Sequence, residues 1–262
     1  MSVNSHLTSL ASDLVLSEQE ELSISISIKE LSSRLNSCFS STVTEHFRFG
    51  SSTRGTILPR KADKHSDIDY MVVFDISNGQ MKPQTYLDRL RRFVNLKYST
   101  SEISQSHPTI VLSLNHINFE LVPAIYYNYA YHIPSPASSW LEWTSTDPSG
   151  TNQLLQDKNK IYNYQIKPLV RLVKYWNTRN GHPFSSFLIE QHIVNRSFWQ
   201  CSLLKDYFYE FWSGFNCTYD TAQYIKNMVN SAKQYAIKAK EHENNNMHLS
   251  AELKIEKIVP SL

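Results

Sequence analysis

The chain has 262 residues, of which 26 are Lys or Arg and 24 are Asp or Glu, so its net charge is +2 at pH 7. This length is sufficient for one large domain or for two lobes with a shared core, and a hydrophobic content of 41% argues against global disorder. The near-neutral charge argues against a broad nucleic-acid surface that binds through phosphate neutralisation alone.

The cysteines and the apolar segments predict a cytoplasmic protein. Cys38, Cys201 and Cys217 form no C-x-x-C motif and no Cys/His cluster at zinc spacing, so we expect free thiols in a reducing compartment. The first residues lack the basic segment and the apolar core of a signal peptide, and no apolar run approaches the length of a membrane span.

The first predicted elements are a leader and a long helix. Residues 1–20 are polar and mixed, and we expect a loose leader or a short helix there. The following stretch ISISI alternates like a strand, but apolar residues recur at helical spacing over four turns. The longer pattern predicts an amphipathic helix, with its apolar positions at Ile24, Ile28, Leu31, Leu35 and Phe39.

The next segment predicts a small mixed sheet with one helix. A short entry strand leads to a Gly-Ser turn at Gly50, and a β-branched and aromatic run predicts a strand over Ile68–Phe74. A helix is expected over Tyr86–Leu96. Two further strands read as a hairpin that turns at Asn115-His116, the second of them ending at Pro123, and residues 125–150 read as a connecting loop region.

The remainder of the chain reads as helical. Ile166, Leu169, Val170 and Val173 share one helix face, and Gly181 is a stop signal. A second helix begins near Ser185 or Ser186, and two more complete the chain. We therefore expect an α+β protein of two lobes separated by a cleft, with a catalytic lobe over residues 21–150 and a helical lobe over 151–262.

Two acids at the start of the central strand are the most informative feature. Side chains alternate along a strand, so Asp67 and Asp69 share one face. Two like charges so close favour a cation between them, and hard oxygen ligands suit Mg²⁺ or Mn²⁺. Glu120, on the hairpin, offers a third carboxylate. Three carboxylates arranged in this way are typical metal ligands of enzymes that catalyse two-metal phosphoryl or nucleotidyl transfer.

Two further features could bind phosphate. Gly50 permits a tight turn with exposed N–H groups, to which Ser51 and Ser52 add hydroxyl donors. Lys167, Arg171 and Lys174 fall on one helix face and could supply positive charge to a triphosphate. Each motif alone is common, and only their order along the chain is specific.

That ordered set resembles the nucleotidyltransferase superfamily of polymerase β type. Within it, the chain is similar to the branch of oligoadenylate synthetases and cyclic GMP–AMP synthase, and most of all to the bacterial CD-NTases of anti-phage CBASS systems. The resemblance covers the chain from about residue 24 to the C-terminus. The matching stretches are FGSSTRGT, SDIDYMVVF, FELVPA, IKPLVRLVKYWN and PFSSFLIE.

The resemblance implies a bilobal fold joined by a spine helix at Ile24–Phe39, and it implies a role for each matching residue. Asp67 and Asp69 would hold two Mg²⁺ or Mn²⁺ ions, and Glu120 would help to deprotonate the acceptor hydroxyl. In the helical lobe Lys174 and Ser186 would contact the triphosphate, and Phe187 would stack on a base. The residues implied in nucleotide binding are Gly50, Ser51, Arg54, Lys174, Ser186 and Phe187.

Three departures from the family pattern stand out. Glu120 replaces the usual Asp and is longer by one C–C bond, about 1.5 Å. The loop from Thr53 to Ser66 is long. The Cys/His zinc insertion of the animal DNA sensor is missing from the sequence, which argues against activation by double-stranded DNA.

The sequence therefore predicts a cyclic oligonucleotide synthase. It would join ribonucleoside triphosphates into a cyclic di- or trinucleotide second messenger, release pyrophosphate and act in anti-phage defence as a monomer. Regulatory CBASS partner proteins and a separate effector that reads the product are implied. Two alternatives stay open: nucleotidyl transfer to a protein, RNA or small molecule, and an inactive nucleotide-binding protein.

Overall fold

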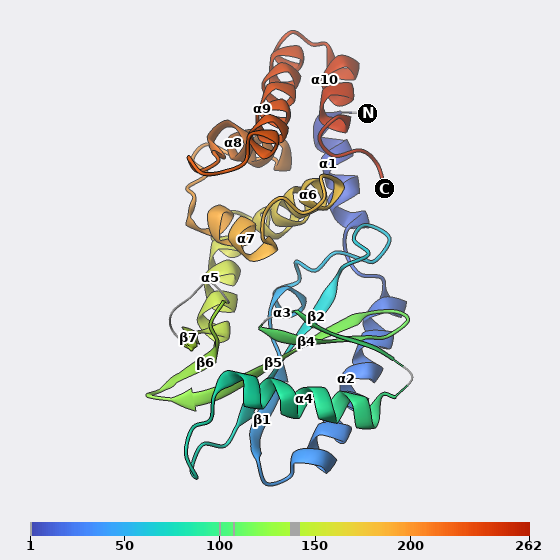
Figure 1. Cartoon of the computed structure of the whole chain (residues 1–262). Coiled ribbons are helices and arrows are strands. Elements are labelled where there is room, and N and C mark those ends of the chain that lie inside the picture. The colour runs from blue at the N-terminus through green and yellow to red at the C-terminus, as the bar shows by residue number, and fades with distance from the viewer. Residues whose placement is uncertain (1, 100, 107, 137–141) are drawn as a thin grey trace. The chain divides into compact units, whose positions relative to one another are not determined.

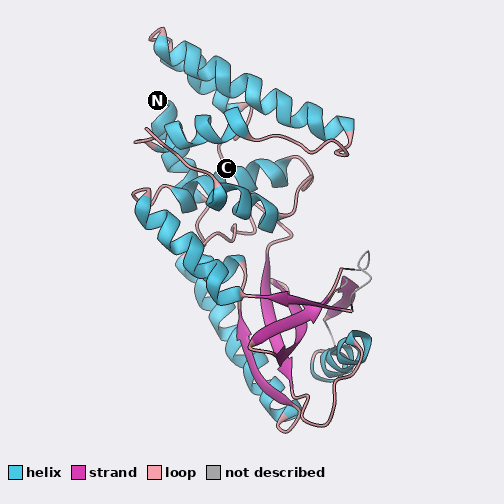
Figure 2. Cartoon of the chain, turned by 90° about the vertical axis from the view of Figure 1, so that its left-hand side faces the viewer, coloured by secondary structure: helices cyan, strands magenta, loops and turns pink. Residues whose placement is uncertain are grey.

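The chain divides into two compact units. The structure, a computed structural model, describes residues 2–99, 101–106, 108–136 and 142–262. One unit, the sheet unit, comprises Ser17–Arg60 and His65–Gln153. The other, the helical unit, comprises Met1–Leu16, Lys61–Lys64 and Leu154–Leu262. In Figure 2 the described strands gather in the sheet unit, whereas the helical unit is drawn with helices and loops.

The sheet unit is built on a mixed sheet of seven strands with the order β1-β2-β5-β4-β3, to which β6 is added along β5 and β7 along β6. The central pair β2 and β5 is parallel, and the other pairs are antiparallel. The strands are β1 (Val43–Arg48), β2 (Asp67–Phe74), β3 (Glu102–Ser106), β4 (Thr109–Ser113), β5 (Asn118–Tyr127), β6 (Ala130–Pro134) and β7 (Trp143–Thr146).

One face of the central strands of this sheet is buried. Ile68, Phe119 and Ile110 on the central strands are fully buried. Helices α2 (Glu18–Phe39) and α4 (Pro83–Lys97) contact the sheet, α2 at β1 and α4 at β3, β4 and β5 (Figure 1). The opposite face carries an apolar cluster toward the far ends of β2 and β5, where Met71, Val73 and Ala124 pack with partly buried hydrophobic side chains. The start of β2 on that second face carries the acids instead.

The helical unit contains α1 (Val3–Asp13), α6 (Ile166–Arg179), α7 (Ser186–Asn195), α8 (Leu204–Gly214), α9 (Gln223–Asn244) and α10 (His248–Glu256). Helix α5 (Pro148–Ile161) begins in the sheet unit and ends in the helical unit. Burial of α6 is nearly complete, and a core of aromatic side chains that includes Trp176 and Trp212 forms around it. Within the described residues, none of the helices combines the length and the apolar character needed to cross a membrane.

Most elements were predictable from the sequence. The long helix predicted at Ile24–Phe39 is α2, which begins earlier at a capping box formed by Ser17 and Glu20. The predicted strand Ile68–Phe74 and helix Tyr86–Leu96 are β2 and α4. The hairpin is β4 and β5, and Gly181 follows α6 with a φ of +76°. The fold class α+β is therefore confirmed.

The expected strand end at Pro123 is wrong, because β5 continues to Tyr127. On one edge of β5, pairing with β4 stops at Leu121 and pairing with β6 begins at Ile125. Pro123 lies between these two stretches, where its missing N–H costs no ladder bond on that edge.

One further expectation needs correction. Residues 125–150 are not only a loop, since they contain the end of β5, all of β6 and β7 and the start of α5; the described part of this segment excludes 137–141. Of the two alternatives expected for residues 1–20, a loose leader or a short helix, the structure has the short helix, α1. Helix α1 buries Leu7 and Leu10 and contacts α6, α8 and α10, whereas α2 begins within the last of these residues.

The turn between α6 and α7 depends on one buried amide. The side chain of Asn177 donates to the carbonyl of Phe184 at 2.8 Å and accepts from its N–H at 3.0 Å, and Asn177 is 1% exposed. Asn177→Ala should lower the free energy of unfolding by about 1–3 kcal/mol, because both groups of Phe184 lose their partner. Urea titration measures this change. Asn227→Ala, on an exposed face of α9, should change it by less than about 0.5 kcal/mol, and equal losses in both variants would contradict the role of Asn177.

Candidate active site

Three carboxylates lie on one face of the central strand pair. Asp67 and Asp69 are at the start of β2, and the parallel register places Asp69 beside Glu120 and Asp67 beside Asn118 on β5. All three acids are half-buried, whereas Ile68 between the two aspartates is fully buried on the other face. The alternation of the strand thus puts the acids together, and the register determines which of them are neighbours.

The environment of Glu120 disfavours its charged form. Burial is the main cause, and the charge of Asp67 adds to it. A hydrogen bond from Thr109, a residue on β4, acts in the opposite direction but is weaker. Together they raise the pKa of Glu120 from 4.5 to about 7. A cation among these carboxylates would reverse this effect, because an opposite charge favours ionised carboxylates.

The turn before α3 (Ser51–Arg54) packs directly against Asp69. Gly50 has a φ of +73°, and a Cβ atom added to it would lie 1.7 Å from Oδ2 of Asp69. The N–H of Phe49 also donates to the carbonyl of Asp69 at 3.0 Å. Glycine is therefore required at position 50 both for backbone conformation and for space.

Donors remain on this turn for an anionic ligand. The N–H groups of Thr53 and Arg54 both donate to the carbonyl of Gly50. Within the described residues, the hydroxyl and N–H of Ser51 make no hydrogen bond. The hydroxyl of Ser52, which was expected to be a donor for phosphate, instead donates to the carbonyl of Phe49 at 3.2 Å. Ser51, the residue directly after Gly50, therefore has a hydroxyl and an N–H group that remain available to a ligand.

Asn152 supports the turn and was not predicted as a site residue. Its side-chain amide donates to the hydroxyl of Thr53 at 3.2 Å, and its oxygen lies 3.5 Å from a guanidinium nitrogen of Arg54. Arg54 itself is buried, at 7% exposure. Nothing in the local sequence of Asn152 pointed to this contact, because it joins residues almost a hundred positions apart.

The other predicted residues belong to the helical unit. Lys174 is 5% exposed, and its ammonium lies 3.6 Å from a carboxylate oxygen of Glu190 on α7. Arg171 donates to the carbonyl of Ala11 at 3.1 Å, and burial lowers its pKa to about 10. Two of the three cations that were expected to supply positive charge from one face of α6, Arg171 and Lys174, thus have partners within the helical unit. Ser186 opens α7, and Phe187 is half exposed.

The long loop after α3 contributes Asp63 to the helical unit. Asp63 is 8% exposed and accepts a hydrogen bond from Thr178 at 3.2 Å, and its other carboxylate oxygen lies 3.4 Å from Nε2 of His182. The residues that lengthen the loop therefore pack against the C-terminal part of α6.

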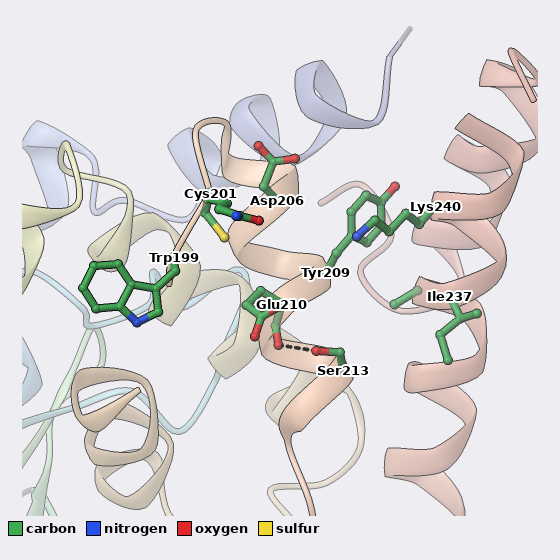
Figure 3. A pocket seen from close by; sticks show the side chains of 10 residues that line it. Trp199, Cys201, Asp206, Tyr209, Glu210, Ser213, Ile237 and Lys240 are labelled. Atoms are coloured by element: carbon green, nitrogen blue, oxygen red, sulfur yellow. Dashed lines mark hydrogen bonds between the residues drawn. The ribbon is translucent and has the colours of Figure 1, made fainter. Parts of the chain in front are cut away.

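A pocket of about 230 Å³ in the helical unit has none of the predicted site residues in its lining (Figure 3). Its lining includes Trp199, Cys201, Glu210 and Lys240. Burial and the nearby acids raise the pKa of the Cys201 thiol to about 11, so this thiol is unreactive at neutral pH. Glu210 is engaged in an ion pair with Arg196 at 2.7 Å. The second acid of the lining, Asp206, accepts from the N–H groups of Ser202 and Leu203, so both carboxylates of this pocket have partners.

The acids of the sheet unit fit a divalent cation. Oxygen ligands from adjacent strands on one face suit Mg²⁺ or Mn²⁺. The raised pKa of Glu120 indicates that positive charge is favourable there. Asp67, Asp69 and Glu120 are accordingly the candidate ligands.

Comparison with known proteins yields a family match over the whole sheet unit and the first part of the helical unit. Residues 1–159 match the Second Messenger Oligonucleotide or Dinucleotide Synthetase domain. A probable cyclic nucleotide synthase of Bacillus cereus (strain VD146) is 24% identical over 163 residues, which cover 55% of this chain and 49% of the relative. The chain thus spans about half the length of this curated relative.

Solved structures share the fold over nearly the whole chain. CdnC of E. coli MS115-1 with ATP matches with a TM-score of 0.70 at 16% identity, covering 98% of each chain. The CD-NTase CdnG of Bradyrhizobium diazoefficiens in complex with GTP matches with a TM-score of 0.72 at 10% identity, again over 98% of each chain. The nucleotidyltransferase fold expected from the sequence is therefore confirmed.

Gly50→Ala should disrupt the acid cluster, because the new methyl group would displace the carboxylate of Asp69. We expect lower stability in urea and at least about tenfold weaker Mn²⁺ binding. Gly79→Ala is the matched control, since Gly79 has a φ of +102° and no atom within 4 Å of an added Cβ. It shares the backbone cost of about 1–2 kcal/mol without the clash. Equal Mn²⁺ affinities in the two variants would contradict the contact with Asp69.

Glu120→Gln should alter the dependence of stability on pH in metal-free protein. The pKa of Glu120 is about 7 when folded and near 4.5 when unfolded, so the folded chain binds this proton more tightly. Its contribution to stability is complete below pH 4.5 and is lost as pH rises to about 7. The neutral glutamine has no such loss, so its advantage over glutamate should grow by about 1–3 kcal/mol across this range. Urea titrations with chelator measure the effect, and parallel pH profiles would refute it.

Proposed function

The chain belongs to the family of second messenger oligonucleotide or dinucleotide synthetases, and on that premise we propose that it is a nucleotidyltransferase that makes a cyclic di- or trinucleotide. Its substrates would be ribonucleoside triphosphates, and pyrophosphate would be released. The proposed role is that of a second-messenger synthase in anti-phage defence.

The observation that carries this proposal is the arrangement around Asp69. The parallel register sets Asp69 beside Glu120, and the Gly50 turn packs against the Asp69 carboxylate. An acid cluster next to a turn with open donors on Ser51 suits a nucleoside triphosphate, whose reacting phosphorus must lie near both. Positioning and electrostatic stabilisation account for most of the catalysis of phosphoryl transfer.

The proposed reaction joins two nucleotides at a time. A ribose hydroxyl of the acceptor attacks the α-phosphorus of the donor, which forms a phosphodiester P–O bond and breaks the bond to the β-phosphate oxygen. Pyrophosphate leaves, and the hydroxyl proton passes to a carboxylate, for which Glu120 is the proposed acceptor. For a dinucleotide, a second round within the linear product closes the ring, and a trinucleotide takes one further addition before closure, with one pyrophosphate released for each bond formed.

We assign the chain's own residues as follows. Asp67 and Asp69 would hold the cations, and Ser51 would donate to the donor phosphates. Two Mg²⁺ or Mn²⁺ ions, when bound, would supply positive charge to the attacking and leaving oxygens. The contacts predicted for Arg54, Lys174, Ser186 and Phe187 stay predictions, and for Lys174 they would have to coexist with its ion pair to Glu190.

Substrate and partner assignments extend the same proposal. The two solved relatives described above are complexes with ATP and with GTP, and we propose purine ribonucleoside triphosphates as the first substrates to test. A regulatory partner protein and a separate effector for the product are part of the proposed defence role.

The experiment is incubation of the chain with α-³²P-labelled ATP, GTP, CTP and UTP in the presence of Mg²⁺ or Mn²⁺. A phosphatase-resistant labelled product and released pyrophosphate are expected. Asp67→Asn with Asp69→Asn should lower the rate by about a thousandfold or more, because several kcal/mol of charge stabilisation are lost. Asp75→Asn, an exposed acid just after β2, is the matched control and should keep the rate.

Three outcomes would overturn the proposal in different ways. Label transferred to an added protein or RNA would favour nucleotidyl transfer to another acceptor. Nucleotide binding without turnover under either metal would favour an inactive sensor. A full rate in the double variant would refute the roles of Asp67 and Asp69.

A further inference from the structure

A second group of metal-ligating side chains lies in the helical unit, where α1 and α10 are in contact. It consists of His6 on α1 and Glu252 and Glu256 on α10. One ring nitrogen and one oxygen from each carboxylate lie within 4.8 Å of one another. These residues play no part in the proposed nucleotidyl transfer.

The ring of His6 is held in a defined orientation. His6 is 4% exposed, and its Nε2 lies 2.9 Å from the carbonyl oxygen of Val259. A carbonyl only accepts, so Nε2 carries the proton, and in the neutral ring the lone pair is on Nδ1. A backbone carbonyl that orients a histidine in this way is the common outer partner of a metal-bound imidazole.

The two glutamates add negative charge next to this ring. Glu252 and Glu256 are separated by one helical turn, so they share a face of α10, and like charges at this spacing repel. Glu252 is 8% exposed. Within the described part of the chain, the bond to Val259 is the one hydrogen bond of the His6 side chain, and the side chain of Glu256 forms neither a hydrogen bond nor an ion pair, whereas Glu252 makes a further polar interaction. The ring therefore does not neutralise the carboxylates by direct pairing.

We propose that His6, Glu252 and Glu256 form a binding site for a divalent transition metal, with Zn²⁺ as its preferred ion. Imidazole nitrogen and carboxylate oxygen are both ligand types of zinc sites, in which these atoms lie about 2.0–2.2 Å from the ion. Two ligand atoms of one ion are therefore at most about 4 Å apart. Small rotations of the glutamate side chains would bring the three ligand atoms within this distance of one another. The imidazole ligand disfavours Mg²⁺ and Ca²⁺ at this site.

The consequence of this site is a metal link between the first and last helices of the chain. A ligand that binds only the folded state adds its binding free energy to stability. The ion would therefore stabilise the packing of α1 against α10. This inference is independent of the proposed enzymatic activity and is tested without it.

The test uses the full chain carrying Asp67→Asn and Asp69→Asn, so that the acids of the sheet unit do not contribute. Zn²⁺ binding is measured by competition with a chromogenic chelator, Co²⁺ binding by visible absorption, and stability by thermal unfolding with and without Zn²⁺. We expect one Zn²⁺ per chain and a rise in melting temperature. Glu256→Gln, at a half-buried position, should weaken binding by at least about tenfold.

Glu241→Gln is the matched control, because Glu241 is an exposed glutamate of α9 in the same unit. It should leave the affinity and the Zn²⁺-dependent rise in melting temperature unchanged. Absence of saturable binding in the starting variant would overturn the proposal. Equal affinities in Glu256→Gln and Glu241→Gln would overturn it as well, and so would a thiolate-to-Co²⁺ charge-transfer band, which would assign the ion to a cysteine.

Discussion

The parallel pairing of β2 with β5 is the constraint on which the candidate site depends. It places Asp69 and Glu120 side by side, and a shift of β2 by one residue would move Asp67 and Asp69 to the buried face, away from Glu120. Apolar packing on the opposite face fixes this register, because Ile68 and Phe119 are fully buried on the face that the helices contact. Apolar packing on one side of the sheet thus offsets the electrostatic repulsion among the carboxylates on the other side.

The glycine turn follows from the same constraint. With Asp69 fixed by the strand pair, the chain that arrives from β1 must pass its carboxylate without a side chain, and Gly50 does so with a positive φ. The turn is then secured by contacts that are distant in sequence, notably those of Thr53 with Asn152. The donors of Ser51 and the acids are therefore held by one local structure.

The sequence predicted what depends on periodicity and missed what depends on tertiary contacts. Alternation placed Asp67 and Asp69 on one face, and helical spacing predicted α2, but neither revealed which residue of β5 lies beside Asp69. Pro123 was interpreted by its missing N–H alone, although the change of partner strand on that edge makes it acceptable. Lys174 looked like a cation for phosphate, and its pairing with Glu190 required the packing of α6 on α7.

The protonation of Glu120 is set by opposing effects of its surroundings. Burial and the charge of Asp67 favour its protonated form, while the hydroxyl of Thr109 favours the carboxylate. The first two effects prevail in the metal-free chain. Because metal ligands bind in their ionised form, cation binding and loss of this proton are thermodynamically linked. A glutamate at this position therefore makes the cluster less repulsive without a cation, while its carboxylate stays beside Asp69 through the register of the sheet.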